Sequence, residues 1–213
     1  MARDINDIFN FIDYLVRKQR GVFVKIEDAM SALDAAQLDK LEDDFSLYGI
    51  NQKIHDSIRP FRVYQPFTSA SDGTVTYESD YLHIVGSPYL VYGSTVTPIT
   101  FILEDEFVST LTNQLRPVNA GNPIARDISN GFVIYPQQVQ VGGYTYIKRP
   151  ATPVLSYIQI GRVITYDPNT SVQLQWSDIY INNIIARALK YLGLNMAEQD
   201  ISAFAENYTN ETI

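Results

Sequence analysis

Glu104, Asp105 and Glu106 are the side chains whose type and spacing come nearest to a catalytic group in this sequence. A glycoside hydrolase needs two carboxylates, one that protonates the leaving oxygen and one that acts as base or nucleophile. Three consecutive acids cannot all face one cleft, however, and acids are favoured in the first turn of a helix by its dipole. We therefore expect a solvated helix start here, and a hydrolase site stays open as an alternative.

Other catalytic chemistry is poorly represented. The sequence has no cysteine, which excludes thiolate nucleophiles and cysteine-based metal sites, and His55 and His83 are its only imidazoles. No glycine-rich phosphate loop, zinc-protease motif or calcium-binding loop occurs. We expect no catalytic residue, no metal and no cofactor, and hence a protein that is not an enzyme.

The charge of the chain disfavours a surface that grips phosphates. Acidic residues outnumber basic ones by 24 to 16, which gives a net charge of −8, whereas non-specific nucleic-acid binding needs clustered Lys and Arg. The acids are concentrated on one side of a helix expected over residues 27–48. They include Asp34, Asp39, Glu42, Asp43 and Asp44. Such a charge run is usually a solvated face, and the alternative is a docking surface for a basic partner.

The elements that position these residues follow from the apolar periodicity. Helical spacing predicts helices over 5–20, 27–48 and 50–58, a short helix over 106–115, and a C-terminal helix that begins at the N-cap Ser177. Trp176 precedes that cap and can pack on Ile181. A further helix is expected after Asn195, with an apolar side made of Ile201, Phe204, Ala205 and Tyr208.

The middle of the chain is expected to be β-rich. Residues 61–77 suggest a hairpin or two short strands, and 131–135 with 145–148 suggest paired strands that turn at Gly142 and Gly143. Residues 157–160 and 163–166 form a further pair across Gly161. The prediction is an α+β fold in one folding unit: helices from 1–59 and 176–213 build a helical body, and 60–175 form a central antiparallel β portion.

Several short motifs carry a family resemblance. They are IHDSIRPF at Ile54–Phe61, IYP at Ile134–Pro136, YIKRPATP at Tyr146–Pro153, and Trp176 followed by IIARALKYLGLN at Ile184–Asn195. Together with the order of helices, β portion and helices, these motifs resemble the ring or head-to-tail connector proteins of crAss-like and related tailed phages of Bacteroidetes. The resemblance spans most of the chain.

The resemblance implies a structural virion protein, made in the host cytoplasm and located in the neck of the particle. Its partners would be copies of itself in a ring, expected to be a dodecamer, the portal protein, and the next ring or tail protein. DNA would pass through the channel without sequence-specific binding, and the acidic set on the second helix would suit a channel face. No membrane partner is expected, because the chain lacks a signal peptide and a run of eighteen apolar residues.

The subunit contacts are expected near the C-terminus, because the apolar surface there exceeds what two short helices can bury alone. The residues assigned to this interface are Trp176, Tyr180, Ile184, Phe204 and Tyr208. One non-connector alternative stays open besides a hydrolase. Tyr-rich strands such as the one containing Tyr144 and Tyr146 would present rings to sugars in a carbohydrate-binding or adhesin-like module.

Overall fold

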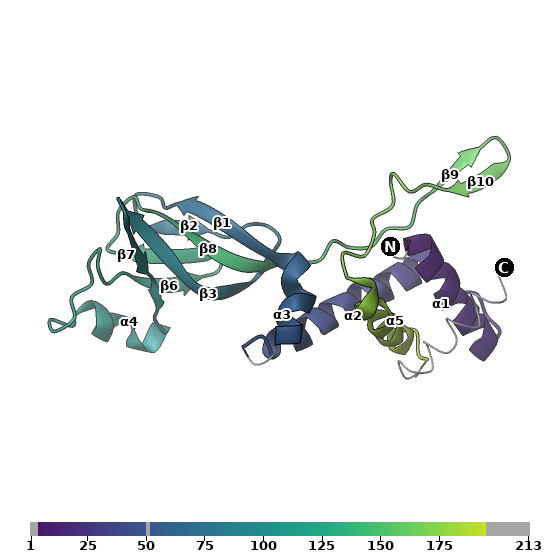
Figure 1. Ribbon diagram of the computed structural model, residues 1–213, viewed down its shortest axis with the longest axis horizontal. Helices are drawn as coiled ribbons and strands as arrows, with labels where there is room; N and C mark the ends of the chain where they lie inside the picture. The colour runs from purple at the N-terminus through teal and green to yellow at the C-terminus, as the bar shows by residue number, and fades with distance from the viewer. Residues whose placement is uncertain (1–3, 50–51, 195–213) are drawn as a thin grey trace. The chain divides into compact units, whose positions relative to one another are not determined.

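The computed structural model describes residues 4–49 and 52–194 and has the predicted α+β fold (Figure 1). The chain divides into two compact units rather than one. The helical unit joins the residues up to Pro60 with those from Pro150 onward, and the β unit is Phe61–Arg149. The expected boundary at residues 175 and 176 therefore lies too far along the chain, because 150–175 belong with the helices.

The helices form where the periodicity predicts them. Helix α1 (Ile5–Arg20) begins at Asp4, whose carboxylate accepts a hydrogen bond from the Asn6 amide, and it ends at Gly21 with φ of 69°. It is followed by α2 (Ile26–Ser46), α3 (Gln52–Ile58) and a 3-10 turn η1 (Arg59–Phe61). The last described helix is α5 (Asp178–Tyr191), with Ser177 as its N-cap.

The core of the helical unit lies where α5 packs against both α1 and α2. Fully buried aliphatic side chains meet there at helical spacing, namely Ile8, Ile12, Leu15, Leu33, Leu41, Ile181, Ile184, Ile185 and Leu189. Each contributes about 1.5–3 kcal/mol by leaving water. Since α5 is separated from α1 and α2 by the whole β unit in sequence, this core forms only when the two ends of the chain meet.

Hydrogen bonds fasten the segment 150–175 to the helices. The Gln37 side chain donates to the Ala151 carbonyl at 3.0 Å, and the Gln173 side chain accepts from the Ile5 amide at 2.7 Å. Within this segment β9 (Tyr157–Ile160) and β10 (Val163–Tyr166) form the expected hairpin across Gly161. The hairpin is thus an appendage of the helical unit.

The β unit contains two four-stranded sheets. The first has the order β1 (Arg62–Thr68), β8 (Val141–Lys148), β3 (Tyr81–Tyr92) and β4 (Thr95–Pro98). The second has the order β2 (Thr74–Thr76), β7 (Gly131–Tyr135), β6 (Ile124–Ile128) and β5 (Thr100–Phe101). Helix α4 (Glu104–Leu111) lies between β5 and β6 in the chain.

The division of the β unit into two sheets decides two of the expected strand arrangements. Residues 61–77 form the second of the two expected arrangements, two short strands, because β1 and β2 lie in different sheets and do not pair. The expected pairing of β7 with β8 is wrong, because the chain passes from one sheet to the other between them. The connections from β1 to β2 and from β7 to β8 are tied together: the Ser69 amide donates to the Gln140 carbonyl at 2.8 Å, and the Ser69 hydroxyl donates to the Gln138 carbonyl at 3.0 Å. The unit is therefore a sandwich.

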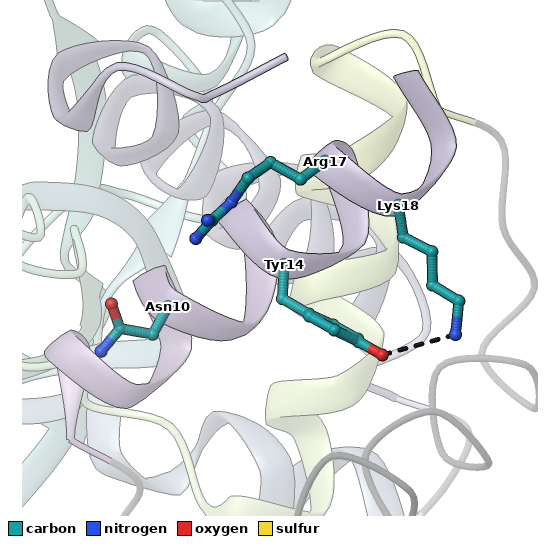
Figure 2. A pocket seen from close by; sticks show the side chains of 4 residues that line it. All are labelled: Asn10, Tyr14, Arg17 and Lys18. Carbon is teal, nitrogen blue, oxygen red and sulfur yellow. Dashed lines mark hydrogen bonds between the residues drawn. The ribbon is translucent and has the colours of Figure 1, made fainter. Parts of the chain in front are cut away.

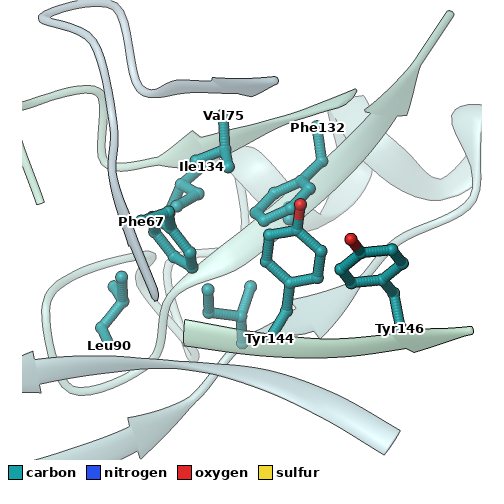
Figure 3. Packing of buried hydrophobic residues seen from close by; sticks show 9 residues of the cluster. Phe67, Val75, Leu90, Phe132, Ile134, Tyr144 and Tyr146 are labelled. Carbon is teal, nitrogen blue, oxygen red and sulfur yellow. The ribbon is translucent and has the colours of Figure 1, made fainter. Parts of the chain in front are cut away.

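Aromatic rings fill the space between the two sheets (Figure 3). Phe67 and Tyr144 from the first sheet meet Phe132 from the second, with ring centroids 5.7 to 6.1 Å apart. Gly142 lies inside β8 and does not form the expected turn. A Cβ atom on Gly142 would lie 2.1 Å from the Tyr89 carbonyl oxygen, so the glycine permits this close approach.

The β unit begins and ends at one place in its own sheet. β1 and β8 are antiparallel, and Arg62 lies opposite Ile147. Asp80 reinforces this end: its carboxylate accepts a hydrogen bond from the Tyr146 hydroxyl at 2.9 Å, and its carbonyl accepts from the Arg149 amide at 2.6 Å. The unit is an insertion whose two ends are neighbours.

Candidate assembly surface

Two acids of the predicted acidic surface hold α5 onto α2. Asp43 Oδ2 accepts a hydrogen bond from Arg187 Nη1 at 2.6 Å, and the Asp39 carboxylate accepts one from the Tyr191 hydroxyl. The bond to Asp39 raises the pKa of Tyr191. Asp39 and Asp43 are exposed, as expected for a solvated face, and they also act as contacts between two helices.

Asp34 and Glu42 are two further acids of the predicted acidic surface. Asp34 is half-buried and accepts a hydrogen bond from the Gln37 side chain at 2.9 Å, which orients the same amide that donates to Ala151. Glu42 is exposed. Of the five acids, Asp39, Glu42 and Asp43 are exposed as predicted, and Asp34 and Asp44 are half-buried.

Lys40 and Asp44 form an ion pair with little exposure. Lys40 Nζ lies 2.8 Å from Asp44 Oδ2, which also accepts from the Ser57 hydroxyl of α3 at 2.7 Å. The ammonium group lies 5.2 Å from the ring centre of Trp176 and 4.8 Å from that of Tyr180. Lys40, Asp44, Ser57 and Tyr180 border a hollow of about 300 Å³, and the ion pair, rather than a ligand, satisfies its charges.

Two of the five residues assigned to the subunit interface are internal. Trp176 is 2% exposed and Ile184 is fully buried, so both belong to the core of their own subunit and are unavailable to a second copy. The apolar surface near the C-terminus is covered by α1 and α2. Tyr180 is half-buried against Trp176. Phe204 and Tyr208 lie outside the described residues.

The hairpin β9–β10 exposes apolar side chains on both faces. The strand register and the alternation of side chains divide it into two faces. One face carries Ile158, Ile160, Val163 and Thr165, and the other carries Tyr157, Gln159, Ile164 and Tyr166. Ile160 and Val163 are each 62% exposed, and Ile164 is 72% exposed. An isolated two-stranded hairpin is marginally stable in water, so this surface suits a partner that covers it.

The base of the hairpin is held by polar contacts. The Tyr157 hydroxyl donates to the Asn6 side chain at 3.1 Å, and the Gln173 side chain donates to the Tyr166 hydroxyl at 2.8 Å. Below it, the Asp167 carboxylate accepts from the Thr170 hydroxyl at 2.7 Å and from the Asn169 amide at 3.0 Å, which lowers the pKa of Asp167. The tip contains Arg162, the only charged residue of the hairpin.

A second apolar surface lies on α4. The helix is fixed by Phe107, whose buried ring packs on Tyr135 with centroids 5.0 Å apart and beneath the Arg126 guanidinium at 5.0 Å. Arg126 Nη1 also lies 3.2 Å from Glu104 Oε1. As expected, the three consecutive acids occupy the first turn of this helix and do not face a cleft.

Anchoring through Phe107 leaves the other apolar residues of α4 and its flanks in solvent. Leu103 is 70% and Val108 67% exposed, and Leu111 and Leu115 are also exposed. We call Leu103, Val108, Leu111 and Leu115 the α4 face. The hairpin and the α4 face each contain at least four exposed apolar side chains that are close together in sequence.

Tyr64, which is exposed, and Tyr89, which is half-buried, form an aromatic pair on the first sheet. Their rings are nearly parallel, with centroids 6.4 Å apart, and their hydroxyl groups lie 2.8 Å apart. The hydrogen bond to Tyr89 raises the pKa of Tyr64. The tyrosines predicted to face sugars, Tyr144 and Tyr146, are instead buried in the core.

The outer face of α1 carries a shallow hollow of about 420 Å³ (Figure 2). Its lining residues, Asn10, Tyr14, Arg17 and Lys18, recur at helical spacing, and Lys18 Nζ lies 3.4 Å from the Tyr14 hydroxyl. Arg17 is already engaged by the Asp13 carboxylate. The hollow is the groove of a single helix and not an enclosed pocket.

The two histidines have structural surroundings. His55 packs on Tyr48 with ring centroids 4.1 Å apart, and His83 lies in β3 opposite Ile147. In residues 4–49 and 52–194, no three His, Asp or Glu side chains gather closely enough to hold a metal ion. Over the same ranges, every helix is too short or too polar to cross a bilayer.

The exposure of the hairpin escaped the sequence analysis, although a signal exists. The segment from Tyr157 to Tyr166 has apolar residues at both odd and even positions. Such a pattern normally marks a strand buried on both faces. In a two-stranded hairpin with no sheet to cover it, the same pattern leaves apolar side chains exposed on both faces. Compared with protein-family models and with curated proteins, this chain gives no match.

Proposed function

We propose that this chain is a non-catalytic structural subunit of a head-to-tail connector in a tailed phage, forming a ring below the portal protein. The observation that carries the proposal is the hairpin β9–β10, which exposes apolar side chains on both of its faces. A soluble monomer rarely exposes such a contiguous patch, and large exposed patches mark interaction sites. The resemblance of the sequence motifs to connector proteins supplies the kind of assembly.

The charge of the chain is compatible with a channel that DNA traverses. With a net charge of −8, a ring of many copies repels phosphates and lets the genome slide, whereas a basic lining would retain it. The acids of α2 contribute to this charge even where they are paired. In this proposal the partners are copies of the chain, the portal protein and the next ring or tail protein, and the location is the neck of the virion.

The test is the mass of the purified full-length protein in solution, measured by light scattering alone and after mixing with the portal protein of the same phage. A closed ring, or a monomer that assembles as a dodecamer on the portal, supports the proposal. A protein that stays monomeric with and without the portal contradicts it. Cryo-electron microscopy of the mixture then locates the ring relative to the portal.

A carbohydrate-binding or adhesin-like module is the second candidate, and Tyr64 with Tyr89 is the observation that favours it. Sugar rings stack on exposed aromatic faces, and the two parallel tyrosines offer one. A glycan array probed with the full-length protein tests this function. Binding that disappears in Tyr64→Ala supports it, and an array without signal rejects it.

A further inference from the structure

We propose that the hairpin β9–β10 of one copy docks on the α4 face of a second copy, with Arg162 at the hairpin tip among the acids of the first turn of α4. This contact rests on the proposed function, because it supplies the joint between neighbouring subunits of the ring. It assigns both partners of that joint to described residues of this chain.

The first argument is the match of apolar surfaces. The hairpin offers Ile160, Val163 and Ile164, all more than half exposed, and the α4 face offers Leu103 and Val108, also more than half exposed. Each surface alone keeps aliphatic side chains in water. A contact between the two surfaces removes both sets of side chains from water, and this burial of apolar surface is the main favourable term in protein association.

The second argument is the match of charges. Arg162 is the only charged residue of the hairpin, and it stands at the turn where an approaching surface is met first. The first turn of α4 carries Glu104, Asp105 and Glu106 next to the apolar residues, and Arg126 contacts only Glu104. An arginine tip on an acidic rim fixes the orientation of the contact and favours encounter of the right surfaces.

The acidic helix α2 fits the hairpin less well. No exposed large apolar side chain lies on α2, and all residues of this helix are described. Helix α2 therefore cannot cover the aliphatic faces of the hairpin. Its acids Asp39 and Asp43 are also engaged by Tyr191 and Arg187. The α4 face has both components that the hairpin requires, whereas α2 has only charge.

The geometry of the contact is head-to-tail. Two different surfaces of the chain meet, one from each copy, so each subunit has one free hairpin and one free α4 face to continue the series. Heterologous contacts of this kind close into rings when the rotation permits and otherwise grow as filaments. A dimer with twofold symmetry would instead pair identical surfaces.

The cysteine-free sequence permits a direct test by disulfide formation. Copies with Arg162→Cys are mixed with copies that carry one cysteine in α4, at Asp105, Glu106 or Ser109, under assembly conditions and mild oxidation. We expect a disulfide between the two kinds of copy with at least one of the three α4 positions. Asp28→Cys, exposed at the start of α2, is the matched control and should give none.

Substitutions in the apolar surfaces test the same contact energetically. Ile164→Ser and Val108→Ser should each raise the concentration for half-assembly about tenfold or more, the effect of losing one buried aliphatic side chain. Ile179→Ser is the control, because Ile179 is 74% exposed, close to the 72% of Ile164, but lies on α5. Circular dichroism verifies that each variant is folded, and the fluorescence of Trp176, the single tryptophan, reports on the helical unit.

The outcomes separate the two proposals. If the protein assembles but Arg162→Cys reacts only with itself or with Asp28→Cys, or if Ile164→Ser and Ile179→Ser assemble equally well, the hairpin contact is overturned and the connector function stands. If the wild-type protein remains monomeric with the portal, the connector function and the contact both fall. Selective disulfides together with selective loss of assembly support the contact.

Discussion

Arg187 Nη1 lies 2.6 Å from Asp43 Oδ2, and this ion pair joins α5 to α2 across a sequence separation of 144 residues. It connects the C-terminal helix to the N-terminal part of the same unit. The side chain of Asp43 is 65% exposed, so water screens much of the attraction.

Arg187→Gln should lower the free energy of unfolding of the helical unit by about 1 kcal/mol or less, the usual range for an exposed ion pair. Urea titration monitored by Trp176 fluorescence measures the change, and the loss should shrink at high salt because salt screens the pair. Asp43→Asn should cost a similar amount. If the double variant loses the sum of the two single losses, the residues do not interact.

Lys40→Met should destabilise the helical unit more strongly, by about 3 kcal/mol. Lys40 is almost fully buried, and its removal leaves the Asp44 carboxylate with only the Ser57 hydroxyl as a close partner. The same urea titration measures the loss. The double variant Lys40→Met, Asp44→Asn should be more stable than Lys40→Met alone, because no uncompensated charge remains. A single variant as stable as the wild type would contradict this account.

Gly142→Ala should disrupt the β unit, at a cost of about 3 kcal/mol or more. The added methyl group would lie 2.1 Å from the Tyr89 carbonyl oxygen and 2.7 Å from the Phe67 ring, and the backbone atom cannot move without breaking the sheet. Circular dichroism during urea unfolding measures the effect. Gly49→Ala is the control, because no atom lies within 4 Å of the Cβ position at Gly49. The free energy of unfolding of this variant should differ from that of the wild type by less than about 0.5 kcal/mol.

Acid should weaken the base of the hairpin through Asp167. The hydrogen bonds from Thr170 and the Asn169 amide hold the pKa of Asp167 below its usual value, so its ionised form stabilises the folded state. That stabilisation is present above the unfolded pKa, about 4, and is lost as the pH falls through the lower folded pKa. Urea midpoints of the wild type should exceed those of Asp167→Asn at neutral pH and converge with them in acid. A difference independent of pH would refute this role.

The helices were predictable because their signals are local. Asp4, the apolar repeat and Gly21 specify α1 without reference to the rest of the chain. The pairing of the strands was not predictable, because a short strand such as 131–135 can pair with any strand that has a free edge. Gly142 and Gly143, before Tyr144, are typical of a turn in sequence. The structure shows instead that Gly142 lets the Tyr89 backbone of the neighbouring strand approach closely.

The residues of the candidate assembly surface divide in the same way, into those that local signals predict and those that depend on distant parts of the chain. The exposed start of α4 was predictable from three acids in a row, since the helix dipole favours them there. The burial of Trp176 was not predictable, because the helices that cover it lie at the opposite end of the sequence. The exposed hairpin was missed because its composition is that of a buried strand, and only the topology shows that it has no covering sheet.

The insertion of the β unit has a consequence for the order of folding during synthesis. Residues 61–149 are contiguous and make their contacts among themselves, so this unit can fold as soon as it leaves the ribosome. Helices α1 and α2 must wait for α5, and until then their apolar sides are open to chaperones or to other chains. The helical unit therefore completes its core only after α5 has been synthesised.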